Sequence, residues 1–217
     1  MAAKSAASSS PANATQERDI ESRILGYFAD KIAWSDPEQA LDTAGSALSD
    51  LAADSALLLE VVGQVVPDQL DPDLGGRGAY WFELAQNKEA DLSIWLRFCP
   101  TGCVAPAHTH SSDVLALVVA GTFKQNLIGI GGGVGSTAAP TKLFVRHERP
   151  GQVFALNTRQ EHETSSTAES LLLAAMPARE APRDGAGPVD GELSAKVRTA
   201  IQRLQRAARG IFSEGSA

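Results

Sequence analysis

A series of short apolar segments in the second half of the chain most constrains its fold. Each segment is aromatic or β-branched in character, and turn residues separate it from the next. Short strands at such a cadence are typical of an all-β sandwich or barrel. The segments span residues 79–85, 92–99, 114–120, 122–130, 142–146, 152–156 and 170–176. We therefore expect a mainly β domain over residues 75–180.

The first part of the chain has a different periodicity. Apolar residues recur at helical spacing over residues 16–33, which predicts an amphipathic helix. Asp36 and Pro37 then predict a second helix start, with Asp36 as the cap and Pro37 in the first turn. A helical stretch over residues 57–66 and a loop rich in Pro, Asp and Gly follow. We expect residues 16–74 to form a helical region before the barrel.

The two ends of the chain lack these patterns. Residues 1–15 predict a disordered tail, and residues 181–191, rich in Pro, Gly and Asp, predict a linker. Apolar residues at helical spacing over residues 192–217 predict a closing helix. Its other face carries Lys196, Arg198, Arg203 and Arg206, which we interpret as a solvated surface.

Composition excludes several classes of function. The chain has 217 residues, of which 43% are hydrophobic and 21% charged, enough for one sizeable core. No apolar run reaches the roughly 20 residues of a membrane helix, and the N-terminus lacks the apolar centre of a secretory signal. We expect a cytoplasmic protein. A net charge of −7 without a basic stripe argues against binding to nucleic acid. Cys99 and Cys103 are interpreted as small strand residues, not as half of a zinc site or a disulfide.

Two of the four histidines lie one residue apart, just before an apolar strand. If His108 and His110 belong to a strand, they point to the same face and can bind one metal ion, while Thr109 points away. The Gly121-Thr122 pair after the apolar run predicts a turn into a second strand, so that the histidines would sit on a β-hairpin. The glycine-rich residues 129–136 predict a hairpin loop, because no helix follows them.

These residues resemble the cupin superfamily. Gly102, the five following residues, His108-Thr109-His110 and Gly121 look like its first motif, and residues 151–162, which end at His162, look like its second. The resemblance covers about residues 79–177. It implies a cupin double-stranded β-helix (a jelly-roll barrel) with metal ligands His108, His110 and His162. His147 lies outside both motifs and is expected at the surface.

The departure from that pattern is informative. Many cupins carry a glutamate ligand four or five residues after the second histidine, and Val114 and Leu115 stand there in this chain. The remaining three-histidine set resembles the thiol dioxygenases of the cysteine dioxygenase family, as does the spacing from Tyr80 to His108. The resemblance implies Fe(II) as cofactor and, as partners, O₂ and a small anionic substrate, most simply a thiol oxidised to a sulfinate. The family's substrate-binding arginine would fall at Phe82, so cysteine itself is not the expected substrate.

Other groups must then hold the substrate. Arg97, next to the metal-binding strand, and Arg159, in the loop before His162, are candidates for binding an anion, and a surface position is the alternative for each. Tyr80 is a third candidate, with Trp95 and Phe82 as further residues that could line the cavity or simply pack in the core.

Three alternatives stay open at this stage. A three-histidine cupin can cleave an enolisable carbonyl compound such as a diketone, or act as an isomerase or lyase without O₂. It can also be a non-catalytic sensor with a structural metal such as zinc. The sequence leaves the oligomeric state open.

Overall fold

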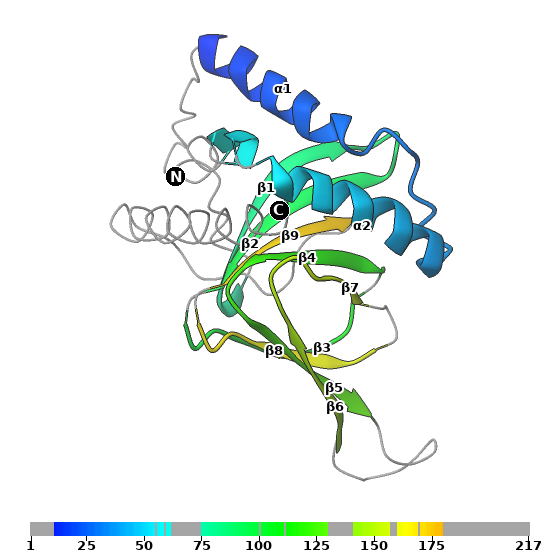
Figure 1. The fold of residues 1–217 in the computed structure, drawn as a ribbon, viewed down its shortest axis with the longest axis vertical. Helices are drawn as coiled ribbons and strands as arrows, with labels where there is room; N and C mark the ends of the chain where they lie inside the picture. Colours follow the sequence, from blue (N-terminus) through cyan, green and yellow to red (C-terminus); the bar gives the residue numbers. More distant parts are fainter. Residues whose placement is uncertain are drawn as a thin grey trace, which may run out of the picture.

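A computed structural model gives the architecture of the chain (Figure 1). It describes residues 11–54, 56–58, 60–61, 75–99, 101–110, 112–129, 141–156, 160–168 and 170–179. The predicted linker, the closing helix, the first ten residues and most of the glycine-rich loop lie outside these ranges. Within them, no helix is long and apolar enough to cross a membrane.

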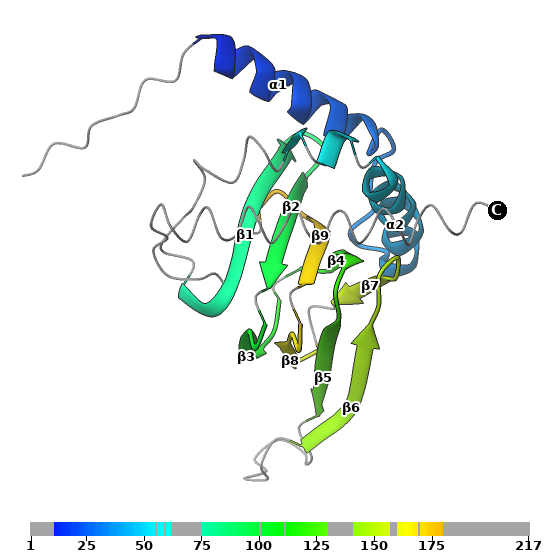
Figure 2. The same cartoon turned by 60° about the vertical axis from the view of Figure 1, so that its left-hand side comes forward.

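Within these ranges, nine antiparallel strands form two sheets, whose arrangement is seen in Figures 1 and 2. The order in the five-stranded sheet is β1 (Gly75–Asn87), β2 (Leu92–Cys99), β9 (Ser170–Met176), β4 (Val114–Ala120) and β7 (Val153–Leu156). The order in the four-stranded sheet is β3 (Val104–His108), β8 (His162–Ser165), β5 (Phe123–Gly129) and β6 (Thr141–Glu148). Apart from β1, this order 2-9-4-7 against 3-8-5-6 is the jelly roll, so the predicted fold class is confirmed.

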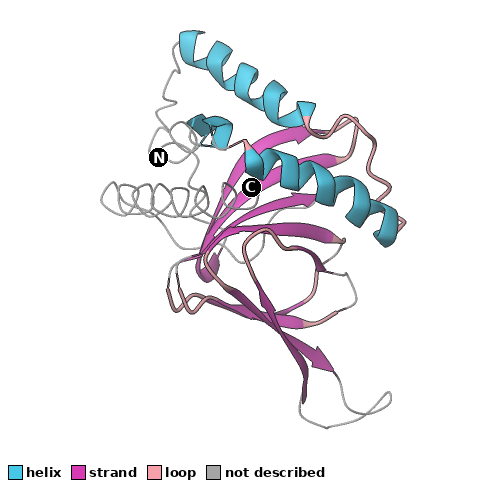
Figure 3. Cartoon of the chain, viewed as in Figure 1, coloured by secondary structure: helices cyan, strands magenta, loops and turns pink. Residues whose placement is uncertain are grey.

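Two helices cover one face of the five-stranded sheet (Figure 3). Helix α1 (Pro11–Gly26) packs on β1, and helix α2 (Pro37–Ala53) packs on β4, β7 and β9. The predicted cap is confirmed, because the Asp36 side chain accepts from the backbone N–H groups of Glu38 and Gln39. Helix α1 begins earlier than predicted, so residues 11–15 of the expected tail are helical.

The five-stranded sheet is buried on both faces. One face meets the helices in a core that includes Phe82, Leu96 and Leu115. The other faces the interior of the barrel, in a second core that includes Trp81, Phe123 and Phe154. All seven residues of β4 and of β9 are buried, which explains their uninterrupted apolar sequences.

The predicted hairpin at Gly121 is wrong. Gly121 has a φ of 82°, where glycine is favoured, and the chain turns there from one sheet into the other. Strands β4 and β5 therefore belong to opposite sheets, whereas β5 and β6 form the antiparallel pair predicted around the glycine-rich loop. Strands β3 and β8 lie outside the predicted apolar segments because they are short and carry polar residues.

Candidate metal centre

Three histidines converge on the four-stranded sheet. Each of His108, His110 and His162 offers a ring nitrogen, and these atoms all lie within 4.8 Å of one another. The ring centroids are 4.5 Å apart for His108 and His162, and 5.0 Å for His110 and His162. This is a group that can hold one metal ion.

Strand pairing brings the two sequence motifs together. His108 ends β3 and lies directly opposite His162, which begins β8. His110 is not in the strand as predicted, because β3 ends at His108 and the chain has already left the sheet. The side chains of His108 and His110 still meet, with ring centroids 5.1 Å apart. The loop after β3 brings them together, and not the alternation of side chains along a strand.

Two backbone carbonyls orient the rings. His108 Nδ1 lies 2.7 Å from the carbonyl oxygen of Pro106, and His162 Nδ1 lies 3.0 Å from that of Gln160. A carbonyl oxygen only accepts, so each Nδ1 carries the proton and donates. The lone pair of each neutral imidazole is then on Nε2, the tautomer that a metal-binding histidine needs.

The cluster contains no carboxylate among the described residues. Val114, one of the two positions where many cupins carry glutamate, packs in the apolar interior of the barrel. His162 is fully buried, whereas His108 and His110 are half-buried, so the cluster is accessible from one side. A divalent ion held here would keep its full charge and favour an anionic ligand.

Arg97 lies inside the barrel, opposite this sheet. It is 4% exposed, and its Nη2 donates to Thr164 Oγ1 at 3.4 Å. Its guanidinium carbon lies 5.0 Å from the Trp81 ring centroid and 5.1 Å from that of Phe123. Thr164 follows His162 by two residues on the same face of β8, about 7 Å along the strand. The structure thus places the predicted Arg97 on the barrel interior, close to the histidine cluster.

A polar group beside Arg97 was missed by the sequence analysis. Gln125 and Glu148 are buried, and Gln125 Nε2 donates to Glu148 Oε1 at 3.1 Å. Arg146 Nε lies 2.9 Å from the same oxygen. Burial raises the pKa of Glu148, and Arg146 opposes that rise. Alternation of Phe123, Gln125 and Leu127 in a strand was the available signal for Gln125.

Two other predicted residues, Tyr80 and Phe82, pack on the helix side of the five-stranded sheet and not in the barrel interior. Tyr80 stacks on Phe98, with ring centroids 6.2 Å apart, and both pack toward the helices, as does Phe82. Burial raises the pKa of Tyr80. Trp95 packs against the barrel interior. Arg159 lies outside the described residues, and His147 is exposed on β6, as predicted.

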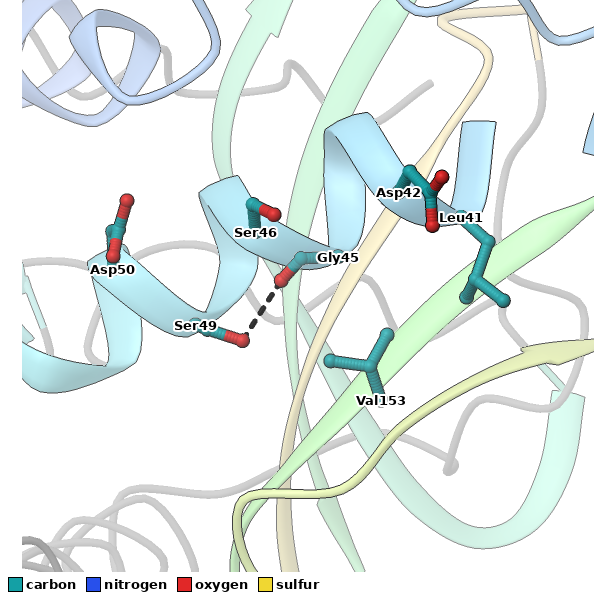
Figure 4. A pocket seen from close by; sticks show the side chains of 7 residues that line it. All are labelled: Leu41, Asp42, Gly45, Ser46, Ser49, Asp50 and Val153. Atoms are coloured by element: carbon teal, nitrogen blue, oxygen red, sulfur yellow. Dashed lines mark hydrogen bonds between the residues drawn. The ribbon is translucent and has the colours of Figure 1, made fainter. Parts of the chain in front are cut away.

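A pocket between α2 and β7 lies on the helix side of the five-stranded sheet, away from the histidines (Figure 4). Gly45 allows this close approach, because a Cβ there would lie 3.2 Å from Val153 Cγ1. Ser49 Oγ donates to the Gly45 carbonyl at 2.8 Å. None of the three histidines lines this pocket.

Comparison with known proteins gives remote likenesses. No family model matches the sequence, and no curated protein matches it. The chain is similar to an RmlC-like cupin from Shewanella frigidimarina (20% identity, 52% of this chain and 89% of that chain, TM-score 0.39). It is also similar to KdgF from Halomonas sp. (22%, 48% and 81%, TM-score 0.37). A third likeness is to a conserved protein of unknown function from Streptococcus pyogenes (14%, 48% and 78%, TM-score 0.36). These likenesses are too remote to indicate an activity, and the strand order identifies the fold.

Proposed function

We propose that this chain is a non-haem Fe(II)-dependent dioxygenase that oxidises a small anionic substrate, most simply a thiol. The observation that carries the proposal is a neutral three-histidine cluster, partly open to solvent, with the buried Arg97 beside it. Three neutral nitrogen ligands suit Fe(II) and leave coordination positions for other ligands. When bound, the ion would supply the redox chemistry by which O₂ oxidises a coordinated thiolate.

The residues of the chain bind and orient the substrate. His108, His110 and His162 would hold the ion, and the carbonyls of Pro106 and Gln160 keep the rings of His108 and His162 in the ligating tautomer. Arg97 would bind the anionic end of the substrate, with Thr164 fixing the position of its guanidinium. Conversion of a thiolate to a sulfinate takes up both atoms of O₂, so no further reductant is required.

The test uses protein purified anaerobically and loaded with Fe(II). We expect thiol-dependent O₂ uptake with small thiols that carry a carboxylate, and both atoms of labelled O₂ in the sulfinate product. His162→Ala should lose both iron and O₂ uptake. His147→Ala is the matched control, because His147 is exposed and outside the cluster, and it should keep both. Undiminished O₂ uptake by iron-free His162→Ala would refute the proposal.

The same preparation separates the alternatives. O₂ uptake with β-diketones but not with thiols would indicate cleavage of an enolisable carbonyl compound. Substrate consumption without O₂ would indicate a lyase or isomerase. Stoichiometric zinc in the purified protein, with no O₂ uptake from any compound, would indicate a metal-binding sensor.

A further inference from the structure

The interior face of the four-stranded sheet is arranged in rows of cross-strand partners. One row runs His108, His162 and Leu127 across strands β3, β8 and β5. The neighbouring row on the same face, two residues further along β8, consists of Thr164, Gln125 and Arg146. Partners that face each other across strands share a face, so Gln125 points into the barrel one row below the metal ligands.

Gln125 is fully buried, and its orientation is fixed. Its Nε2 donates to Oε1 of Glu148, which also lies 2.9 Å from Arg146 Nε. The Arg146 guanidinium can only donate, so that carboxylate oxygen is an acceptor, and the Gln125 amide presents its nitrogen to it. The Gln125 Oε1 atom is therefore directed away from Glu148.

No donor among the described residues reaches Gln125 Oε1. A buried acceptor without a donor costs free energy, so buried polar atoms are normally matched by protein, water or ligand. Thr164, the cross-strand partner of Gln125, accepts a hydrogen bond from the Arg97 guanidinium. An anion held between the metal centre and Arg97 would thus pass beside this acceptor.

We propose that Gln125 is a specificity-determining residue whose Oε1 accepts a hydrogen bond from a hydroxyl group of the substrate. The inference rests on the proposed function and adds a substrate class. The substrate is a small acid that carries a metal-binding atom, an anionic group for Arg97 and a hydroxyl between them. An ammonium group at that position would be repelled by the metal ion and by Arg97.

The test measures binding to Co(II)-loaded protein without O₂, from changes in the visible spectrum of the ion. Three thiols differ only at the carbon next to the carboxylate: 3-mercaptopropionate has no donor there, 3-mercaptolactate has a hydroxyl and cysteine has an ammonium. Glycerate against 3-hydroxypropionate repeats the comparison with oxygen in place of sulfur. We expect the hydroxyl compound to bind about tenfold more tightly than its unsubstituted partner in at least one series.

Gln125→Met removes the acceptor at similar volume, and it should reduce that preference to less than about twofold. If Gln125→Met does not fold, Glu148→Gln serves instead. Its neutral amide allows the Gln125 amide to turn either way, and the preference should fall about threefold.

The inference is overturned if the compounds within each series bind with equal affinity. It is also overturned if none of the compounds binds. Tighter binding of cysteine than of 3-mercaptolactate, or a preference that persists in both variants, also overturns it. These results differ from failure of the proposed function, which would appear as discrimination by the Co(II)-loaded protein without O₂ uptake by the Fe(II)-loaded protein.

Discussion

At the scale of single residues, the histidine cluster depends on short local contacts. The carbonyls of Pro106 and Gln160 lie two residues before the histidines that they orient. The chain thus prepares the ligating nitrogen of His108 and of His162 with its own backbone, and no second side chain is needed for this purpose. Substitution of Pro106 or Gln160 would therefore leave the acceptor in place, whereas displacement of the backbone would remove it.

Arg97 is the residue for which substrate binding and folding are most readily separated. Arg97→Met keeps an apolar stem between Trp81 and Phe123 but removes the charge. Charge-assisted hydrogen bonds are worth about 1.5–3 kcal/mol, so the KM for a carboxylate-bearing thiol should rise about 10- to 100-fold.

Iron content should stay at the wild-type level in Arg97→Met, because Arg97 is not a ligand. Arg149→Met is the matched control, since Arg149 is exposed, and its KM should stay within about twofold of wild type. A normal KM in folded, iron-loaded Arg97→Met would show that the anion is held elsewhere.

At the scale of elements, the sequence predicts what local periodicity determines. The seven apolar segments predicted β1, β2, β4, β5, β6, β7 and β9, and Asp36 with Pro37 predicted the start of α2. Strands β3 and β8 could not be predicted this way, because β3 contains Pro106 and β8 consists of His-Glu-Thr-Ser. Their pairing is long-range, and it is this pairing that joins His108 to His162.

The assignment of strands to sheets was also beyond local reasoning. A glycine between two apolar segments is compatible with a hairpin and with a crossing between sheets, and Gly121 makes the crossing. For the same reason, the sequence did not show on which face of the sheet Gln125 lies. Its neighbours Phe123 and Leu127 indicate a strand face, but only the pairing with Thr164 shows that this face looks into the barrel.

Asp54 lies between α2 and the helical residues 56–58, and its effect on stability should depend on pH. It ends α2, and its side chain accepts from Leu57 N–H at 2.9 Å and from the Tyr27 hydroxyl at 2.8 Å. These hydrogen bonds lower the pKa of Asp54. A lowered pKa means that the ionised form is favoured in the folded protein, so this stabilisation is present at neutral pH and is lost as pH falls through the folded-state pKa.

Loss of a helix cap costs about 1 kcal/mol, so Asp54→Ala should lower the free energy of unfolding by that amount at pH 7. The deficit should shrink toward pH 3. Urea unfolding at both pH values measures it, with Asp50→Ala, an exposed position on α2, as the control. A deficit that is equal at both pH values would contradict the role of the ionised side chain.

At the scale of the whole molecule, the two faces of the five-stranded sheet differ in role: one packs against the helices, and the other lines the barrel that contains the candidate site. The face under α1 and α2 carries the larger apolar core, and the opposite face closes the barrel over Arg97. His108 and His162 come from the four-stranded sheet and His110 from the loop after β3, and no helix of the described residues packs closely on that sheet. We therefore expect the helical side to fold without metal, and a metal ion to bind to a barrel that is already formed.

This arrangement predicts a folded metal-free protein that an added ion stabilises further. Binding to the folded state alone at a free ion concentration 100 times Kd contributes about 2.7 kcal/mol, which corresponds to a rise in Tm of about 5–10 °C for a chain of this size. Thermal unfolding with and without Co(II), after treatment with a chelator, measures the rise. His147→Ala should show the full rise and His162→Ala none, because only His162 belongs to the cluster. A chain that unfolds completely when the metal is removed would show instead that the ion is required to close β3 onto β8.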